Sequence, residues 1–144
     1  MFYREDWIIK QIETLIAALI DAVFKNKSSE KTYVQEQNTI DELIEKNKIC
    51  EAENFIFERA KLEGTVNDSE FLLTVLHFYQ RLNNMSEEDL NAAGFSHDEI
   101  KDGLIDFFSK YCGDEKIKGI IENAYLDEVI ATSTQANEKE DDSI

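Results

Sequence analysis

Two histidines, His77 and His97, are the side chains on which ordinary acid–base catalysis near neutral pH would have to depend in this chain. His77 lies in the stretch "DSEFLLTVLHFYQRLNN", which has the apolar periodicity of a helix. Thr74, His77 and Arg81 gather on the side of that helix opposite its apolar residues. Such a polar strip can line a binding site, but it is also typical of the solvent side of a half-buried helix, so both interpretations stay open.

The other reactive residue types lack the spacing that catalysis or metal binding requires. His97 falls inside a helix-start motif, Ser96-His97-Asp98-Glu99, and the sequence contains no Glu-x-x-His, no HExxH and no glycine-rich phosphate loop. Cys50 and Cys112 stand far apart, without a CxxC or Cys/His spacing, and are expected to be small buried thiols. We therefore predict no catalytic residues and no cofactor.

A cluster of carboxylates in "NNMSEEDLNAAGFSHDEIKDG" is the one arrangement that suggests a metal ion. Its members are Glu87, Glu88, Asp89, Asp98 and Glu99. All of them fall in the first turns of two expected helices, where the helix dipole favours negative charge. Helix capping accounts for them, and we predict no metal site.

The charge of the chain argues against a nucleic-acid partner. Its 144 residues include 15 Lys and Arg against 31 Asp and Glu, which gives a formal net charge of -16, and no cluster of basic residues is present. A basic partner fits this charge, although an acidic surface that keeps a protein soluble is the commoner explanation.

The apolar opening "MFYREDWIIKQIETLIAALIDAVFKNK" could be an anchor, a core helix or a surface for another chain. Its longest uninterrupted apolar run is residues 15–20, far below the ~20 residues that span a bilayer. Charges at Glu5, Asp6, Lys10 and Glu13 also exclude the pattern of a secretory signal. We predict no membrane span and a cytoplasmic location.

The same stretch carries a wide apolar stripe with helical spacing. The stripe is wider than one neighbouring layer of helices needs, and part of it is compatible with a heptad pattern. We therefore predict that the first helix is both a core element and the interface of a homodimer. The expected interface residues are Phe2, Trp7, Ile9, Ile12, Ile16, Leu19 and Val23.

The rest of the chain is punctuated as further helices. Proline is absent and only five glycines occur, while Ser86 with Asp89 and Ser96 with Glu99 form capping boxes. We predict an all-α fold of six or seven helices packed as antiparallel hairpins, with "DSEFLLTVLHFYQRLNN" at its centre. Residues 1–132 are expected to form one domain, and residues 133–144 a disordered acidic tail.

Two resemblances follow from particular stretches. The segments "MFYREDWIIKQIETL", "LIEKNKICEAENFIFERA" and "LHFYQRLNNMSEEDLNAAGFSHDEIKDGL" together resemble a family of small bacterial proteins known only as a domain of unknown function. That resemblance implies an all-helical cytoplasmic protein and supplies no activity, cofactor or site residue. "EKNKICEAENFIFERA" also resembles part of a tetratricopeptide unit, with Ala52 and Ile56 at packing positions, but no second unit recurs along the chain.

These observations favour a structural or protein-interaction module that binds a protein partner or itself. The alternative is a small-molecule sensor or an enzyme that uses the polar strip around His77. Burial separates the two interpretations, because a binding strip would line a closed pocket.

Overall fold

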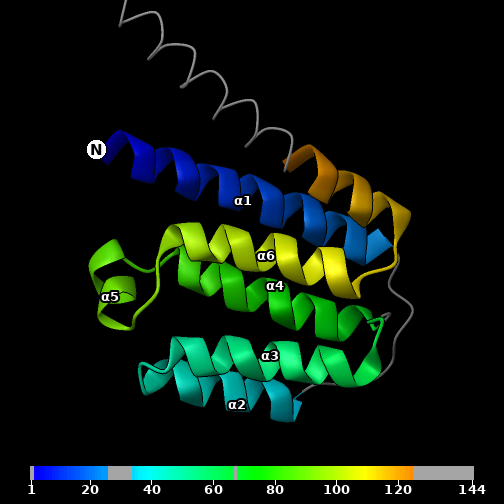
Figure 1. The fold of residues 1–144 in the computed structure, drawn as a ribbon, viewed down its shortest axis with the longest axis horizontal. Coiled ribbons are helices and arrows are strands. Elements are labelled where there is room, and N and C mark those ends of the chain that lie inside the picture. Colours follow the sequence, from blue (N-terminus) through cyan, green and yellow to red (C-terminus); the bar gives the residue numbers. More distant parts are fainter. Residues whose placement is uncertain (1, 26–33, 67, 125–144) are drawn as a thin grey trace, which may run out of the picture.

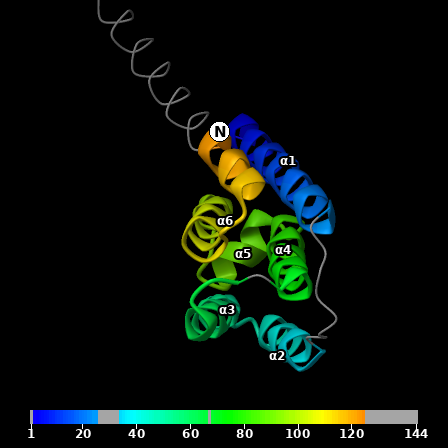
Figure 2. The same cartoon turned by 90° about the vertical axis from the view of Figure 1, so that its right-hand side faces the viewer.

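The fold is a stack of helix pairs, shown by the computed structural model in Figures 1 and 2. The structure describes residues 2–25, 34–66 and 68–124. Its helices are α1 (Phe2–Lys25), α2 (Val34–Glu45), α3 (Ile49–Glu63), α4 (Ser69–Asn83), α5 (Glu87–Ala92) and α6 (His97–Tyr111), and residues 115–124 form a seventh helical segment. No strand occurs among these residues, which confirms the predicted all-α fold.

Three layers make up the stack. The two views agree that α1 and residues 115–124 form one outer layer, that α4 and α6 form the middle layer, and that α2 and α3 form the other outer layer. Helices α2 and α3 form an antiparallel hairpin, and α4 and α6 run antiparallel with the short α5 joining them at one end (Figure 1). The predicted acidic tail lies outside the described residues.

Helix α4 is buried over most of its circumference because it lies between two layers. Phe71, Val75 and Tyr79 are fully buried, and even Leu73 is nearly so. A helix covered on both sides needs a far wider apolar arc than the ~100° stripe of a surface helix. The predicted central position of this segment is confirmed.

Predicted capping residues fix where the helices begin. The Ser86 hydroxyl accepts a hydrogen bond from the Asp89 amide at 3.1 Å, and the Ser96 hydroxyl accepts one from the Glu99 amide at 3.2 Å. Asp68 caps α4 in the same way, through the Glu70 amide at 3.0 Å. Gly64 ends α3 with a φ of 76°, a left-handed conformation that glycine adopts without strain.

One expectation about the cysteines is wrong. Cys112 is buried as predicted, but Cys50 is exposed. The apolar face of α3 consists of Ile49, Ala52, Ile56 and Ala60, and position 50 lies off that face.

We predict that Ser96→Ala lowers the free energy of unfolding by about 0.5–2 kcal/mol, because the Glu99 amide loses its acceptor at the start of α6. Urea unfolding followed by circular dichroism measures this change. Ser109→Ala, an exposed position in the same helix, is the control and should be nearly neutral. Equal stability of the two variants would contradict the cap.

Candidate functional site

The predicted polar strip on α4 is split between three environments. Thr74 is buried, and its hydroxyl donates to the Glu70 carbonyl at 3.0 Å, while His77 is exposed. Arg81 pairs with Asp41 of α2, at 2.9 Å from Nη1 to Oδ1. These three residues line none of the three hollows described below.

Most of the predicted interface residues belong to the core of the chain itself. Ile12, Ile16, Leu19 and Val23 are all buried, and α1 packs through this stripe on α4 and α6. The Asn83 side-chain amide also donates to the Ile9 carbonyl at 3.1 Å, which holds α1 against the end of α4. The Phe2 side chain lies outside the described residues. A surface that α1 offers to another chain must therefore consist of other side chains.

The outward side of α1 presents a second regular row of side chains, which we call the α1 seam. All of its members are exposed, and they follow one another at alternating steps of three and four residues: Trp7, Lys10, Thr14, Ala17, Asp21 and Phe24. Trp7 is 45% exposed and Phe24 is 54% exposed, at opposite ends of the row. This spacing is that of the contact positions in a two-helix coiled coil.

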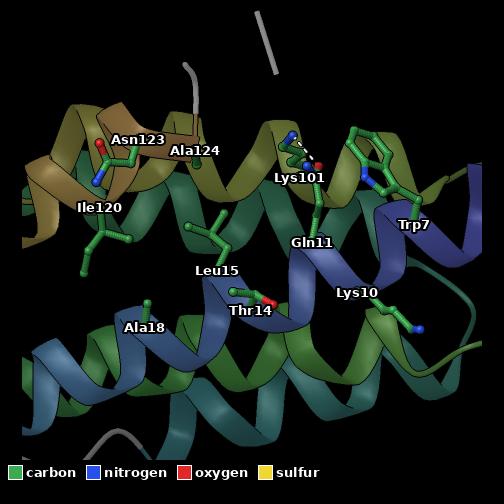
Figure 3. A pocket seen from close by; sticks show the side chains of 10 residues that line it. All are labelled: Trp7, Lys10, Gln11, Thr14, Leu15, Ala18, Lys101, Ile120, Asn123 and Ala124. Carbon is green, nitrogen blue, oxygen red and sulfur yellow. Dashed lines mark hydrogen bonds between the residues drawn. The ribbon is translucent and has the colours of Figure 1, made fainter. Parts of the chain in front are cut away.

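On one side of the seam lies a cavity of about 440 Å³ between α1, α6 and residues 115–124 (Figure 3). We call it the Lys101 cavity. Its apolar lining residues are Trp7, Leu15, Ala18, Ile120 and Ala124. Its polar lining residues are Lys10, Gln11, Thr14, Asn123 and Lys101. Its size falls within the ~300–1,000 Å³ range of small-molecule pockets.

Lys101 is buried in this cavity, with only 5% of its surface exposed. Its ammonium donates a hydrogen bond to the Gln11 side-chain oxygen at 2.8 Å and lies 5.9 Å from the centre of the Trp7 ring. Figure 3 shows these three groups together at one end of the cavity, whereas Lys10 points away from them. The ammonium, an amide oxygen and an aromatic face thus share one small volume.

A shallower groove of about 540 Å³ follows the other side of the seam, between α1 and α4. Ile16, Ile20 and Phe24 provide apolar surface, and Glu13 and Asp21 provide carboxylates. Asn83 also lines this groove, and its side-chain oxygen is buried without a hydrogen-bond partner among the described residues. The two sides of α1 therefore differ in charge, with lysine on one and carboxylates on the other.

A third hollow, of about 530 Å³, is an open groove between α3 and α6. Its acidic residues are Glu53, Glu99, Asp102 and Asp106. Within the part of the chain that the structure describes, no group of His, Cys, Asp and Glu has the arrangement needed to hold a metal ion. The groove is therefore described as an acidic surface.

One buried hydrogen bond lies beneath this groove. The Tyr79 hydroxyl, at the centre of the core, donates to Glu53 Oε2 at 2.7 Å. Burial raises the pKa of Tyr79 well above its ordinary value, and the Glu53 carboxylate adds to this shift. The pKa of Glu53 is also raised, chiefly by burial, although the hydrogen bond from Tyr79 opposes the shift.

Gly103 of α6 makes room for this bond. A Cβ atom at position 103 would lie 2.6 Å from the Tyr79 hydroxyl and would overlap the Glu53 carboxylate. Glycine is otherwise unfavourable inside a helix by ~1 kcal/mol. The close approach of α6 to the Tyr79–Glu53 pair explains its presence here.

Sequence reasoning missed Lys101, Gln11 and the Tyr79–Glu53 pair. A signal for Lys101 exists, because it lies three residues before Leu104 and so shares the buried side of α6. A lysine at a core position is seldom buried without a particular reason. No comparable signal marks Tyr79 and Glu53, whose contact joins two helices.

Comparison with known proteins places the chain in a family. The model of a family described as a family of unknown function, DUF6483, matches residues 2–112. This span includes the six labelled helices, and the chain belongs to that family. The predicted resemblance to a domain of unknown function is confirmed, whereas the resemblance to a tetratricopeptide unit stays a prediction. Neither the curated proteins nor the solved structures contain a significant match.

We predict that Gly103→Ala lowers the free energy of unfolding by about 1–3 kcal/mol, because the added methyl group overpacks the Tyr79–Glu53 contact. Thermal and urea unfolding measure the change. Gly119→Ala is the matched control, since nothing lies near its Cβ position and alanine favours a helix by up to ~1 kcal/mol. The same response at both positions would show that Gly103 does not need to be small.

We predict that Glu53→Gln gains stability relative to the natural chain as the pH rises from 4.5, the ordinary pKa of a glutamate. The folded chain holds the Glu53 proton to a higher pH than the unfolded chain does, so ionisation of Glu53 lowers stability across that window. Urea unfolding over a pH series measures the difference. The exposed Glu51→Gln in the same helix is the control. A stability difference between Glu53→Gln and the natural chain that does not vary with pH would contradict the prediction.

Proposed function

We propose that this member of the DUF6483 family is a cytoplasmic structural module that pairs with a second copy of itself through the α1 seam. The observation that carries the proposal is the order of side chains along α1. The inward stripe is already buried by the chain's own helices, while the outward seam retains coiled-coil spacing and two exposed aromatic residues. Within the described residues, no helix has the length and apolarity of a bilayer-spanning segment.

The seam is complementary to itself when two copies of α1 run antiparallel. A two-fold axis between Leu15 and Ile16 brings unlike residues of the two copies face to face. The facing pairs are Trp7 with Phe24, Lys10 with Asp21, and Thr14 with Ala17. Two aromatic contacts and two opposite-charge contacts result.

Each part of this arrangement has a physical role. Thr14 and Ala17 are small and lie nearest the axis, so the two helices can approach closely there. Trp7 and Phe24 supply apolar area toward both ends of the seam, and aromatic side chains are frequent contributors to binding. Lys10 and Asp21 fix the direction, because a parallel pair would place like charges opposite each other.

The predicted affinity is modest. Two crossed helices bury less than the ~1,200 Å² of a standard interface. A dissociation constant on the order of micromolar, or about -8 kcal/mol, matches such an interface. The sensor or enzyme alternative around His77 has less support, because His77 is exposed and Arg81 is paired with Asp41.

We predict that Lys10→Glu and Asp21→Lys each weaken self-association at least tenfold, because each places two like-charged pairs across the axis. Mixing the two variants restores a dimer with one chain of each kind, since every facing pair is then of opposite charge. Sedimentation equilibrium across a concentration series measures both effects.

Lys46→Glu, the same charge change at an exposed position away from α1, is the control and should leave self-association unaltered. A natural chain that stays monomeric well above micromolar concentration would overturn the proposal. A dimer that both single variants retain would place the interface elsewhere.

A further inference from the structure

We propose that the α2–α3 hairpin is a pH-sensitive element, which separates from α4 and α6 more readily once the Glu53 carboxyl group at their junction loses its proton. The hairpin is the outer layer opposite α1 (Figure 2), so this part of the molecule does not include the α1 seam. Linkage at Glu53 fixes how the stability of the whole chain varies with pH, whereas the contacts around Glu53 indicate which part of the chain responds.

Glu53 lies where the hairpin meets both helices of the middle layer. Its carboxylate accepts a hydrogen bond from the Tyr79 hydroxyl of α4 at 2.7 Å, and Tyr79 is fully buried. The backbone of α6 also comes so close at Gly103 that a Cβ atom there would overlap the carboxylate. The carboxyl group is thus held between α4 and α6, and it becomes fully hydrated only when α3 moves away from them.

The groups that face Glu53 disfavour its charge. Its titratable and charged neighbours are Tyr79 of α4, Cys50 of α3, and Glu99, Asp102 and Asp106 of α6. None of the seven residues that line the groove, all of them in the described ranges, is Lys or Arg, although Asp106 is also paired with Lys110 at 3.2 Å. Burial raises the pKa of Glu53, the hydrogen bond from Tyr79 opposes this, and the charges of Glu99 and Asp106 raise the pKa further.

Ionisation of Glu53 therefore favours the separated hairpin. Once α3 has moved away, Glu53 is hydrated and its pKa returns to the ordinary 4.5. The packed hairpin holds the proton to a higher pH than the separated one does. As the pH rises from 4.5 through the pKa of the packed state, the packed form loses stability relative to the separated form. Above that pKa the difference stays constant.

The hairpin can separate as a unit because α2 and α3 contact each other more than either contacts α4 or α6. The ion pair between Arg81 of α4 and Asp41 of α2 is about half exposed, where such pairs contribute little. The buried face of α3, which includes Ile56, keeps the packed form predominant. The response is thus a change in how often the hairpin separates, a kind of local opening that precedes global unfolding.

Native-state hydrogen exchange measures how often each helix opens. We would follow the amides of α3 and of α1 in the full chain from pH 4.5 to neutral pH, and divide each rate by the intrinsic rate of an unfolded peptide at the same pH. We expect the protection of α3 to fall relative to that of α1 by about threefold or more over this range, and then to level off.

Three variants assign the response to Glu53. Glu53→Gln keeps the shape of the side chain and removes its titration, so the ratio of protection should no longer vary with pH, whereas the exposed Glu51→Gln should retain the variation. Tyr79→Phe removes the hydrogen bond that lowers the pKa of Glu53, so the fall should move to higher pH. A merely structural role of Tyr79 would change the protection without moving the pH at which it falls.

The proposal is overturned if α3 and α1 lose protection in parallel as the pH rises, because the chain then opens only as a whole. It is also overturned if the ratio of protection still varies with pH in Glu53→Gln, which would place the response at other groups. The same profile is expected in the Lys10→Glu chain, whose substitution lies in α1 and weakens self-association. Loss of the profile in that chain would likewise contradict the proposal, so this test is separate from the test of the α1 seam.

Discussion

The burial of α4 between two layers of helices is the constraint on which the rest of the fold depends. Phe71, Val75 and Tyr79 point into the core from this one helix, and α1 and α6 both pack on it. Because α4 must be covered on both sides, α1 becomes an outer helix that buries only its inward face. The outward side of α1 is therefore where the chain has freedom to present a surface.

The amino-acid sequence predicted the local features well, because their causes lie within a few residues. Ser86 and Ser96 cap helices that begin where the capping boxes indicate. The apolar residues of α4 cover enough of the helix circumference to predict a central position. These signals depend on propensity, capping and periodicity, which need no knowledge of how the helices pack.

Features that depend on contacts between helices could not be predicted in the same way. The stripe of Ile12, Ile16 and Leu19 is equally compatible with a core and with a dimer interface until its neighbours are known, and the structure uses it as core. Tyr79 and Glu53 are 26 residues apart in sequence. Lys101 and Gln11 are 90 residues apart. No local pattern reports such a pair, so the Lys101 cavity becomes visible only when α1, α6 and residues 115–124 are placed together.

The central claim, antiparallel pairing of α1, is tested most directly by disulfide trapping. Lys10→Cys and Asp21→Cys are made in a chain whose exposed Cys50 is replaced by serine, and each is oxidised alone and as a mixture. The account predicts a covalent dimer only in the mixture, because a disulfide needs Cα atoms within about 7 Å of each other and residues 10 and 21 of different copies face each other. Covalent dimers that form as readily from either variant alone would show parallel pairing and would contradict the account.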